Sequence, residues 1–324
     1  MWAAGIVAIA ATLPAVHAHP HGEQWALANE YPASSLAGEG DEFFAKRVAN
    51  LTQGRIEIVA MPDARLGYKS REQMKAVAEG KVAMADTLGS ALAEDDAIFG
   101  LASLPFIVRD AGQAHALYRA ARPAYEAAFA RHNQKLLYAT PWPASGVWSK
   151  APVTGLDAVA KLRIRTYDKI GTDLFTRLGA SASVVSFTDL PAKLASGEID
   201  AVLSSGDGGA GRKLWEHLPR FTEINYAMPL NFTTVNLDKW KSLDDATRGA
   251  IEEAATQAEA RQWKALDERL AQNYARMREQ GMTIDTAISP ELRARLRDAA
   301  RAAADEWAAK AGPQGAALLK GAGN

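Results

Sequence analysis

The chain has 324 residues, of which 48% are hydrophobic and 23% charged, with 37 Lys and Arg against 38 Asp and Glu. Such a chain is folded and is long enough for two domains. It contains no cysteine, which excludes disulfides, thiolate nucleophiles and cysteine-ligated metal sites. The formal net charge of -1 argues against a nucleic-acid partner, because binding to a phosphate backbone needs a clustered basic excess.

The N-terminal segment has the character of an export signal. Residues 1–16 carry no charge and are rich in Ala, Ile, Val and Leu, and Val16-His17-Ala18 has the small-x-small form of a signal-peptidase site. A membrane span needs about 20 apolar residues, and no stretch of the sequence reaches that length. We therefore expect a signal peptide over residues 1–18, cleaved after about Ala18, and a periplasmic mature chain that does not span the membrane. The usual positive n-region is missing, and a buried N-terminal helix is the alternative.

The histidines show no spacing typical of metal ligands. His115, His132 and His217 each stand alone within helical patterns. His21 would be the third residue of a cleaved chain, but Pro20 has no amide proton to release to copper or nickel. We expect no metal and no cofactor.

Strand and helix patterns alternate along the first two thirds of the chain. An alternating run from Trp25 ends at Pro32, helical spacing follows over 40–53, and residues 55–61 alternate again. The same succession recurs in five later segments: 71–79, 82–87, 161–167, 171–178 and 182–186. Strands that alternate with helices predict sheets with helices on both faces and a ligand near the carboxyl ends of the strands.

The C-terminal third has a different pattern. Residues 244–280 contain no proline and carry an intermittent apolar stripe, which predicts one long helix or two nearly continuous ones, long enough to cross two domains. Residues 290–310 predict a further amphipathic helix. The glycine-rich tail over 312–324 is expected to fray.

Five segments resemble, in order, the substrate-binding subunits of tripartite ATP-independent periplasmic (TRAP) transporters, of the dicarboxylate-binding-protein type. They cover about residues 24–310 and are Gly54-Arg55-Ile56-Glu57-Ile58, Leu104-Pro105-Phe106, Lys161-Leu162-Arg163-Ile164-Arg165, Leu194-Ala195-Ser196-Gly197-Glu198-Ile199-Asp200 and Asn236-Leu237-Asp238-Lys239-Trp240. No single motif is specific for this family. The five motifs in this order, together with an export signal, are.

The resemblance implies an α/β, two-domain periplasmic binding protein fold (type II-like), with mixed sheets flanked by helices and a long domain-crossing helix. It divides the chain into domain I, residues 23–145 and 232–262, and domain II, residues 146–231 and 263–324. The implied function is capture of a small organic acid and its delivery to the small and large TRAP membrane subunits. We expect a monomer and no enzymatic activity.

In the family, the arginine of the "K-[IL]-R-V" strand holds the ligand's carboxylate, and the matching residue here is Arg165. A guanidinium suits this role because its planar fork pairs both carboxylate oxygens and stays charged when buried. Arg163 lies two residues earlier and is expected on the same face of the strand. The position near the carboxyl end of the strand favours Arg165. The structural alternative is an arginine paired to a core carboxylate.

Two departures from the family pattern bear on the ligand. Where many members continue "G-Q-E-N-P", this chain has Ala201-Val202-Leu203-Ser204-Ser205-Gly206, so Ser204 matches the ligand-binding Asn, with Ser205 and Gly206 beside it. Where many members carry a second arginine, this chain has Trp148. Exchange of a charge for an aromatic ring predicts a monocarboxylate with an apolar or aromatic body.

Other aromatic residues lie on or beside the expected strand ends. Candidate walls of the site, besides Trp148, are Tyr167, Tyr31, Tyr68 and Trp142. Asn231 follows a proline near the second domain crossing and is a candidate hydrogen-bond partner of the ligand. Each aromatic ring has packing in a core as its structural alternative.

An exported α/β enzyme, either a hydrolase or a nucleotide-dependent one, is the competing function. Residues 206–211 satisfy G-x-G-x-x-G, a spacing that can cradle a pyrophosphate at the start of a helix. The acidic residue expected about 20 residues later is missing, since Glu223 comes too early and Asp238 too late. No G-x-S-x-G, H-E-x-x-H or P-loop motif is present. The sequence therefore favours a binding protein.

Overall fold

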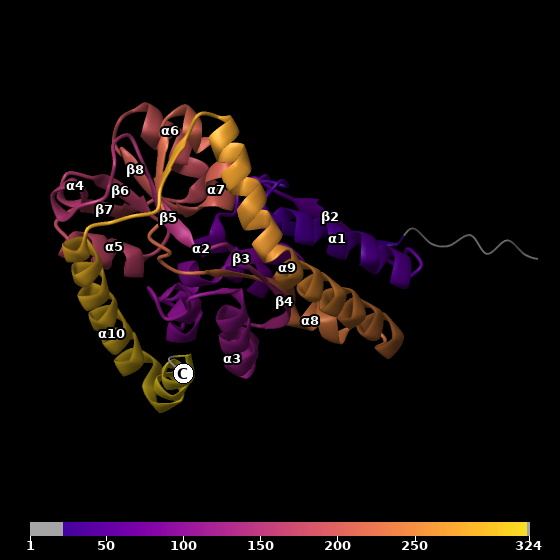
Figure 1. Cartoon of the computed structure of the whole chain (residues 1–324). Coiled ribbons are helices and arrows are strands. Elements are labelled where there is room, and N and C mark those ends of the chain that lie inside the picture. Colours follow the sequence, from indigo (N-terminus) through magenta and orange to yellow (C-terminus); the bar gives the residue numbers. More distant parts are fainter. Residues whose placement is uncertain (1–21, 323–324) are drawn as a thin grey trace, which may run out of the picture.

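The computed structural model describes residues 22–322, which form two mixed sheets with helices packed against them (Figure 1). This confirms the predicted fold class. The signal peptide expected over residues 1–18 lies outside the described residues. None of the helices in the described part of the chain is long and apolar enough to cross a bilayer.

The first sheet has the strand order β2-β1-β3-β10-β4. Strand β10 is antiparallel to both of its neighbours, and the other pairs are parallel. Its strands are β1 (Glu23–Asn29), β2 (Ile56–Met61), β3 (Met84–Leu88), β4 (Gln134–Pro141) and β10 (Leu230–Asn236). Every residue of β3 and β10 is buried, as in central strands that are covered on both faces. This sheet and the helices on it are called the first lobe.

The second sheet has the order β11-β9-β5-β8-β6-β7. Strand β6 pairs in parallel with β7 and β8, whereas β5 is antiparallel to β8 and β9. The strands are β5 (Ser145–Ser149), β6 (Arg163–Thr166), β7 (Ser181–Val184), β8 (Ala201–Ser205), β9 (Arg220–Thr222) and β11 (Thr283–Asp285). This sheet and its helices are called the second lobe.

The helices cover the sheets and link the lobes. They are α1 (Leu36–Leu51), α2 (Ser70–Ala78), α3 (Ala111–Arg131), α4 (Leu156–Ala160), α5 (Lys169–Arg177), α6 (Leu190–Ala195), α7 (Gly206–Gly211), α8 (Leu237–Lys241), α9 (Asp245–Glu279) and α10 (Pro290–Ala322). The 35-residue α9 packs on α1 and β4 near its start and reaches α7 and β11 near its end, so it crosses from one lobe to the other, as predicted (Figure 1).

The chain passes between the sheets in two further places. One connection joins β4 to β5 and the other joins β9 to β10. The exact division into domain I and domain II given above stays a prediction.

Residues 313–322 of the expected tail are not frayed, because the helix resumes after a kink at Gly312, where φ is 69°, and continues to Ala322. Leu318 and Leu319 pack against the apolar core that holds Trp307, and this burial holds the tail in place.

Candidate solute-binding site

A small cavity lies between the two lobes at the strand ends. The first lobe and the connections contribute Tyr31, Leu88, Trp142 and Pro229, and the second contributes Ser145, Arg165, Tyr167, Phe187, Ser204, Ser205 and Gly208. The volume is about 20 Å³, roughly the space that one or two water molecules need. The lobes are therefore closed on each other, and a solute that enters must be small and must part them.

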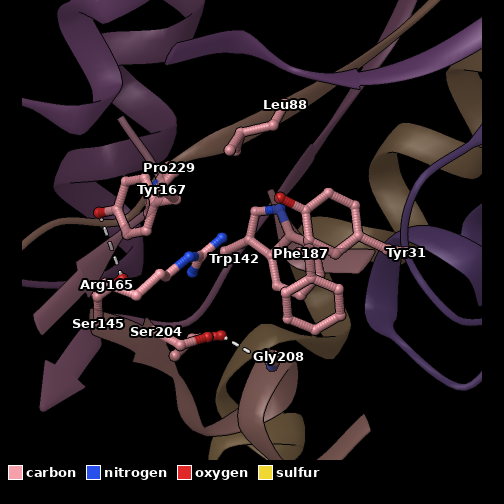
Figure 2. A pocket seen from close by; sticks show the side chains of 11 residues that line it. Tyr31, Leu88, Trp142, Ser145, Arg165, Tyr167, Phe187, Ser204, Gly208 and Pro229 are labelled. Atoms are coloured by element: carbon pink, nitrogen blue, oxygen red, sulfur yellow. Dashed lines mark hydrogen bonds between the residues drawn. The ribbon is translucent and has the colours of Figure 1, made fainter. Parts of the chain in front are cut away.

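Arg165 carries the charge of this cavity. Its Nε donates to the carbonyl of Val185 at 2.7 Å and its Nη1 to the carbonyl of Leu203 at 3.1 Å. These two bonds orient the guanidinium, whose remaining N–H groups point into the space between Tyr167, Trp142 and Phe187 (Figure 2). Only 2% of the side chain is exposed. Burial lowers the pKa of Arg165, but an arginine of this kind remains protonated.

The structure separates the two arginines of β6. The Nε of Arg163 donates to Asp200 at 2.9 Å, and about half of the Arg163 side chain is exposed. Arg165 forms no ion pair with a carboxylate within residues 22–322; its two protein partners are carbonyls. A buried cation without a protein counter-ion is suited to an anion that enters from outside.

Aromatic rings form most of the wall around the guanidinium. The ring of Tyr31 lies 4.7 Å from those of both Trp142 and Phe187, between ring centroids. The Arg165 carbon Cζ lies 6.0 Å from the centroids of Tyr167 and of Phe187. Such faces attract the cation and pack well against a flat apolar body.

Hydroxyl groups complete the polar part of the cavity. Ser204 and Ser205 end β8, and Ser205 also caps α7, because its Oγ accepts from the Gly208 amide at 3.1 Å. Ser145 donates to the Tyr167 hydroxyl over 3.4 Å (Figure 2). These groups can both donate to and accept from a solute.

The glycine run after β8 is a helix, not a phosphate-binding loop. Residues Gly206–Gly211 form α7, which lies directly over Trp148. A Cβ at position 209 would fall 2.0 Å from the Trp148 ring, so glycine permits this close approach. Trp148 is fully buried and donates to the carbonyl of Ser205 at 3.3 Å. It therefore supports the wall from behind and does not line the cavity.

Three other candidates also lie outside the lining. Gly206 faces α9, near Asn273 and Met277. Tyr68 packs against the small cluster around Val77. Asn231 is buried behind Trp142 and accepts its Nε1–H at 2.8 Å, so it holds a wall residue. The structure brings together Arg165, Tyr167, Tyr31, Trp142, Ser204 and Ser205.

The sequence reasoning missed five lining residues: Leu88, Ser145, Phe187, Gly208 and Pro229. A usable signal existed for two of them. Leu88 is the last residue of β3, and Phe187 lies three residues after the end of β7, where the rule on strand ends places ligands. Pro229 and Ser145 enter through the crossing connections, whose course depends on both sheets.

Polar contacts close the rim beside the cavity. A second chamber of about 200 Å³ shares Arg165, Tyr31 and Phe187 with the first. At its edge, Lys69 of the first lobe pairs with Asp189 of the second at 2.8 Å. Glu30 accepts from the Thr188 amide at 3.3 Å and from the Ser70 amide at 2.8 Å. The Lys69–Asp189 and Glu30–Thr188 contacts join the two lobes, whereas the Glu30–Ser70 contact lies within the first.

Two lobes joined by crossing connections and one long helix, closed over a buried cation, define a two-lobed solute-binding protein. The model of DctP, described as bacterial extracellular solute-binding protein, family 7, matches residues 27–311. The chain belongs to this family. The family acts outside the cytoplasm, and its TRAP members work with membrane subunits. The protein is thus a receptor for a small organic acid and not an enzyme.

Solved structures of similar chains agree with this assignment. DctP6 of Bordetella pertussis, an extracytoplasmic solute receptor binding pyroglutamic acid, is 30% identical, with a TM-score of 0.88 over 93% of this chain and 99% of its own. DctP7 of the same organism, also binding pyroglutamic acid, is 25% identical and has a TM-score of 0.90. The match covers 94% of this chain and 100% of DctP7. A TRAP solute-binding protein from an unidentified marine microbe, in complex with co-purified pyroglutamate, is 27% identical and has a TM-score of 0.89. The match covers 93% of this chain and 99% of the marine protein. No curated protein gives a significant match.

Proposed function

We propose that this receptor binds L-pyroglutamate, or a monocarboxylate of similar size and polarity, and delivers it to the small and large membrane subunits of a TRAP transporter. One observation carries the proposal: Arg165 is the single charged side chain among the residues described as lining the cavity. One guanidinium neutralises one carboxylate. The three similar structures described above bind pyroglutamate, which supports the same choice.

The residues that line the cavity fit the chemistry of this ligand, which enters when the lobes part. A carboxylate on the free N–H groups of Arg165 places a small flat ring against the aromatic walls, Tyr31, Trp142 and Tyr167. The lactam N–H and C=O then find partners in the hydroxyls of Ser204 and Ser205. Asn231, Trp148 and Gly206 act indirectly, by holding the wall and α7. Tyr68 has no role in this arrangement.

Calorimetry with four related compounds tests the proposal. L-pyroglutamate is compared with 2-pyrrolidinone, which lacks the carboxylate, with L-proline, which carries a cationic amine, and with succinate, which has a second carboxylate. We expect binding of L-pyroglutamate and a large loss with each of the others. Tighter binding of succinate than of L-pyroglutamate would refute the single-charge site. Recovery of unchanged L-pyroglutamate after incubation distinguishes a receptor from an enzyme.

The export and assembly state form a second part of the proposal. We infer cleavage after Ala18, because Val16-His17-Ala18 has the small-x-small form of a signal-peptidase site, and a monomer, because the cavity lies between two lobes of the same chain. Sequencing the N-terminus of protein recovered from the periplasm tests the cleavage site. Light scattering on the purified chain, with and without L-pyroglutamate, tests the monomer. A dimer in both conditions would overturn it.

A further inference from the structure

Two buried carboxylates lie behind the wall of the cavity in the first lobe. Asp41 of α1 and Asp86 of β3 are 1% and 0% exposed. Both accept from the same nitrogen, Nδ2 of Asn29, Asp41 at 2.6 Å and Asp86 at 3.3 Å. The two carboxyl groups are therefore close neighbours, and neither forms an ion pair within residues 22–322.

The surroundings of this pair contain no compensating positive charge. Tyr138 of β4 donates to Asp41 at 3.0 Å, and Thr233 of β10 lies opposite Asp86 in the sheet. Asp86 Oδ1 and Thr233 Oγ1 have no partner among the described residues. From α9, Glu259 approaches β4 at the Ala139 amide and is already paired with Arg122 at 2.9 Å. Tyr31, the wall residue beside the pair, lies within electrostatic reach of Asp86 and also of Glu30, Arg165 and Asp168.

Such a pair is stable only when it holds a proton. Two ionised carboxylates side by side repel each other, and burial of each without a cation is strongly unfavourable. A proton between them removes one charge and supplies a hydrogen-bond donor that the site otherwise lacks. Burial raises the pKa of both groups, that of Asp86 to about 7 and that of Asp41 in the same direction, where the neighbouring Asp86 adds to the rise.

The pair is connected to two walls of the solute site. Asn29, which bridges the carboxylates, also accepts the Tyr31 amide on its Oδ1 at 2.8 Å. Asn231 accepts from Trp142 at 2.8 Å, and its own amide contributes to the pKa of Asp86. The rings of Tyr31 and Trp142 are in contact. Asn29 thus contacts the acid pair directly and holds Tyr31, and Asn231, which lies near Asp86, holds Trp142.

We propose that Asp41 and Asp86 share a proton that positions Tyr31 and Trp142, so that stability and solute affinity both fall as rising pH removes the proton. The affinity half of this inference rests on the proposed function, whereas the stability half does not. A carboxyl whose folded pKa lies above its unfolded pKa destabilises the fold as pH rises between the two values. Reciprocally, ligand binding at alkaline pH takes up protons.

The first test measures unfolding by urea without ligand, from about pH 6 to about pH 9. We expect the unfolding equilibrium constant of the wild type to rise roughly tenfold or more over this range. Asp86→Asn keeps the shape and removes one of the two titrating carboxyl groups, so its unfolding constant should rise less with pH than that of the wild type. Asp173→Asn, at a partly exposed carboxyl that pairs with Lys169, serves as the control and should retain the wild-type slope. Asp168, whose burial raises its pKa to about 6, titrates mainly below this range.

A second measurement needs no variant. Infrared spectroscopy of the wild type should show the carbonyl band of a protonated carboxyl that disappears as the pH rises. Absence of this band at neutral pH, or an unchanged pH slope in both Asp86→Asn and Asp41→Asn, would overturn the shared proton. Stabilisation by sodium ions at constant pH and ionic strength would also overturn it, because a bound cation would then replace the proton.

The third test addresses the coupling to the solute. Calorimetry with L-pyroglutamate at about pH 8, in buffers of different ionisation enthalpy, should show proton uptake by the wild type and less by Asp86→Asn. Binding without proton uptake, while the infrared band titrates, would refute the coupling and leave the proposed function intact. If L-pyroglutamate does not bind at all, the proposed ligand fails, but the unfolding and infrared results still decide whether the proton is shared.

Discussion

The two lobes place opposite buried charges on either side of one cavity. In the second lobe, Arg165 is held by two carbonyls and turns its free N–H groups to the cavity. In the first, Asp41 and Asp86 are buried behind Tyr31 and Trp142 and have no cationic partner among the residues that the structure describes. A charge that faces the cavity can be balanced by a solute, whereas a sealed charge can be balanced only by a proton. Under the proposed function, the second lobe supplies the charge that binds the solute, and the first lobe and the connections supply the wall residues Tyr31 and Trp142.

Removal of the second lobe's charge should have the largest effect. Arg165→Ala leaves the solute's carboxylate buried without a partner, which costs about 2–5 kcal/mol of binding free energy, at least about a 30-fold rise in Kd. Arg165→Lys should recover little, because the planar fork is lost. The matched control is Arg163→Ala on the same strand, whose partner is Asp200. Calorimetry that finds the two alanine variants equal would remove Arg165 from the site.

The support of the second lobe can be broken without touching the cavity. Gly209→Ala forces a methyl group against the Trp148 ring, 2.0 Å away, and overpacking of this kind costs about 1–3 kcal/mol of folding stability. Gly249→Ala in α9 has nothing within 4 Å and should instead stabilise by up to about 1 kcal/mol. Urea unfolding of the two variants measures the contrast. Equal stabilities would contradict the close contact of α7 with Trp148.

A change in the wall of the first lobe should raise Kd less than removal of Arg165 does. Trp142→Phe removes the N–H that Asn231 accepts and leaves a buried acceptor unpaired, a loss of about 1 kcal/mol or somewhat more. We expect a moderate rise in Kd for L-pyroglutamate together with lower stability. Trp215→Phe, at a partly buried ring outside the cavity, controls for the change in ring size. If both variants bind as the wild type does, Trp142 does not form the wall.

Loss of the ion pair between the lobes, Lys69–Asp189, should change Kd least. Lys69 and Asp189 are each about two fifths exposed, and an ion pair of this kind contributes at most about 1 kcal/mol. Lys69→Gln should weaken binding slightly at low ionic strength and not measurably at high salt. Lys46→Gln breaks a pair within α1 and should leave Kd unchanged at both. A salt-independent loss in Lys69→Gln would show a role other than closure.

Much of the site could be predicted because it depends on local positions in strands. Arg165 stands near the carboxyl end of β6, and Ser204 and Ser205 end β8, so the rule on strand ends places all three correctly. Trp148 could not be placed in this way. Whether its ring faces the cavity or the core depends on α7, which lies over it only because position 209 is glycine. The same glycines satisfied a nucleotide-binding spacing, although their role is in packing.

The sequence by itself determined the alternation of strands and helices, the long helix and the family, and it limited the candidate cation to Arg163 or Arg165, because each of these features depends on residues near one another in the chain. Only the tertiary structure decided which of two arginines is buried, which aromatic rings form the wall, and that Asp41 meets Asp86 behind it. Those outcomes depend on strands that pair across long intervals of sequence and on lobes that close on each other. Burial and charge balance are set by neighbours in space, and a linear pattern does not specify them.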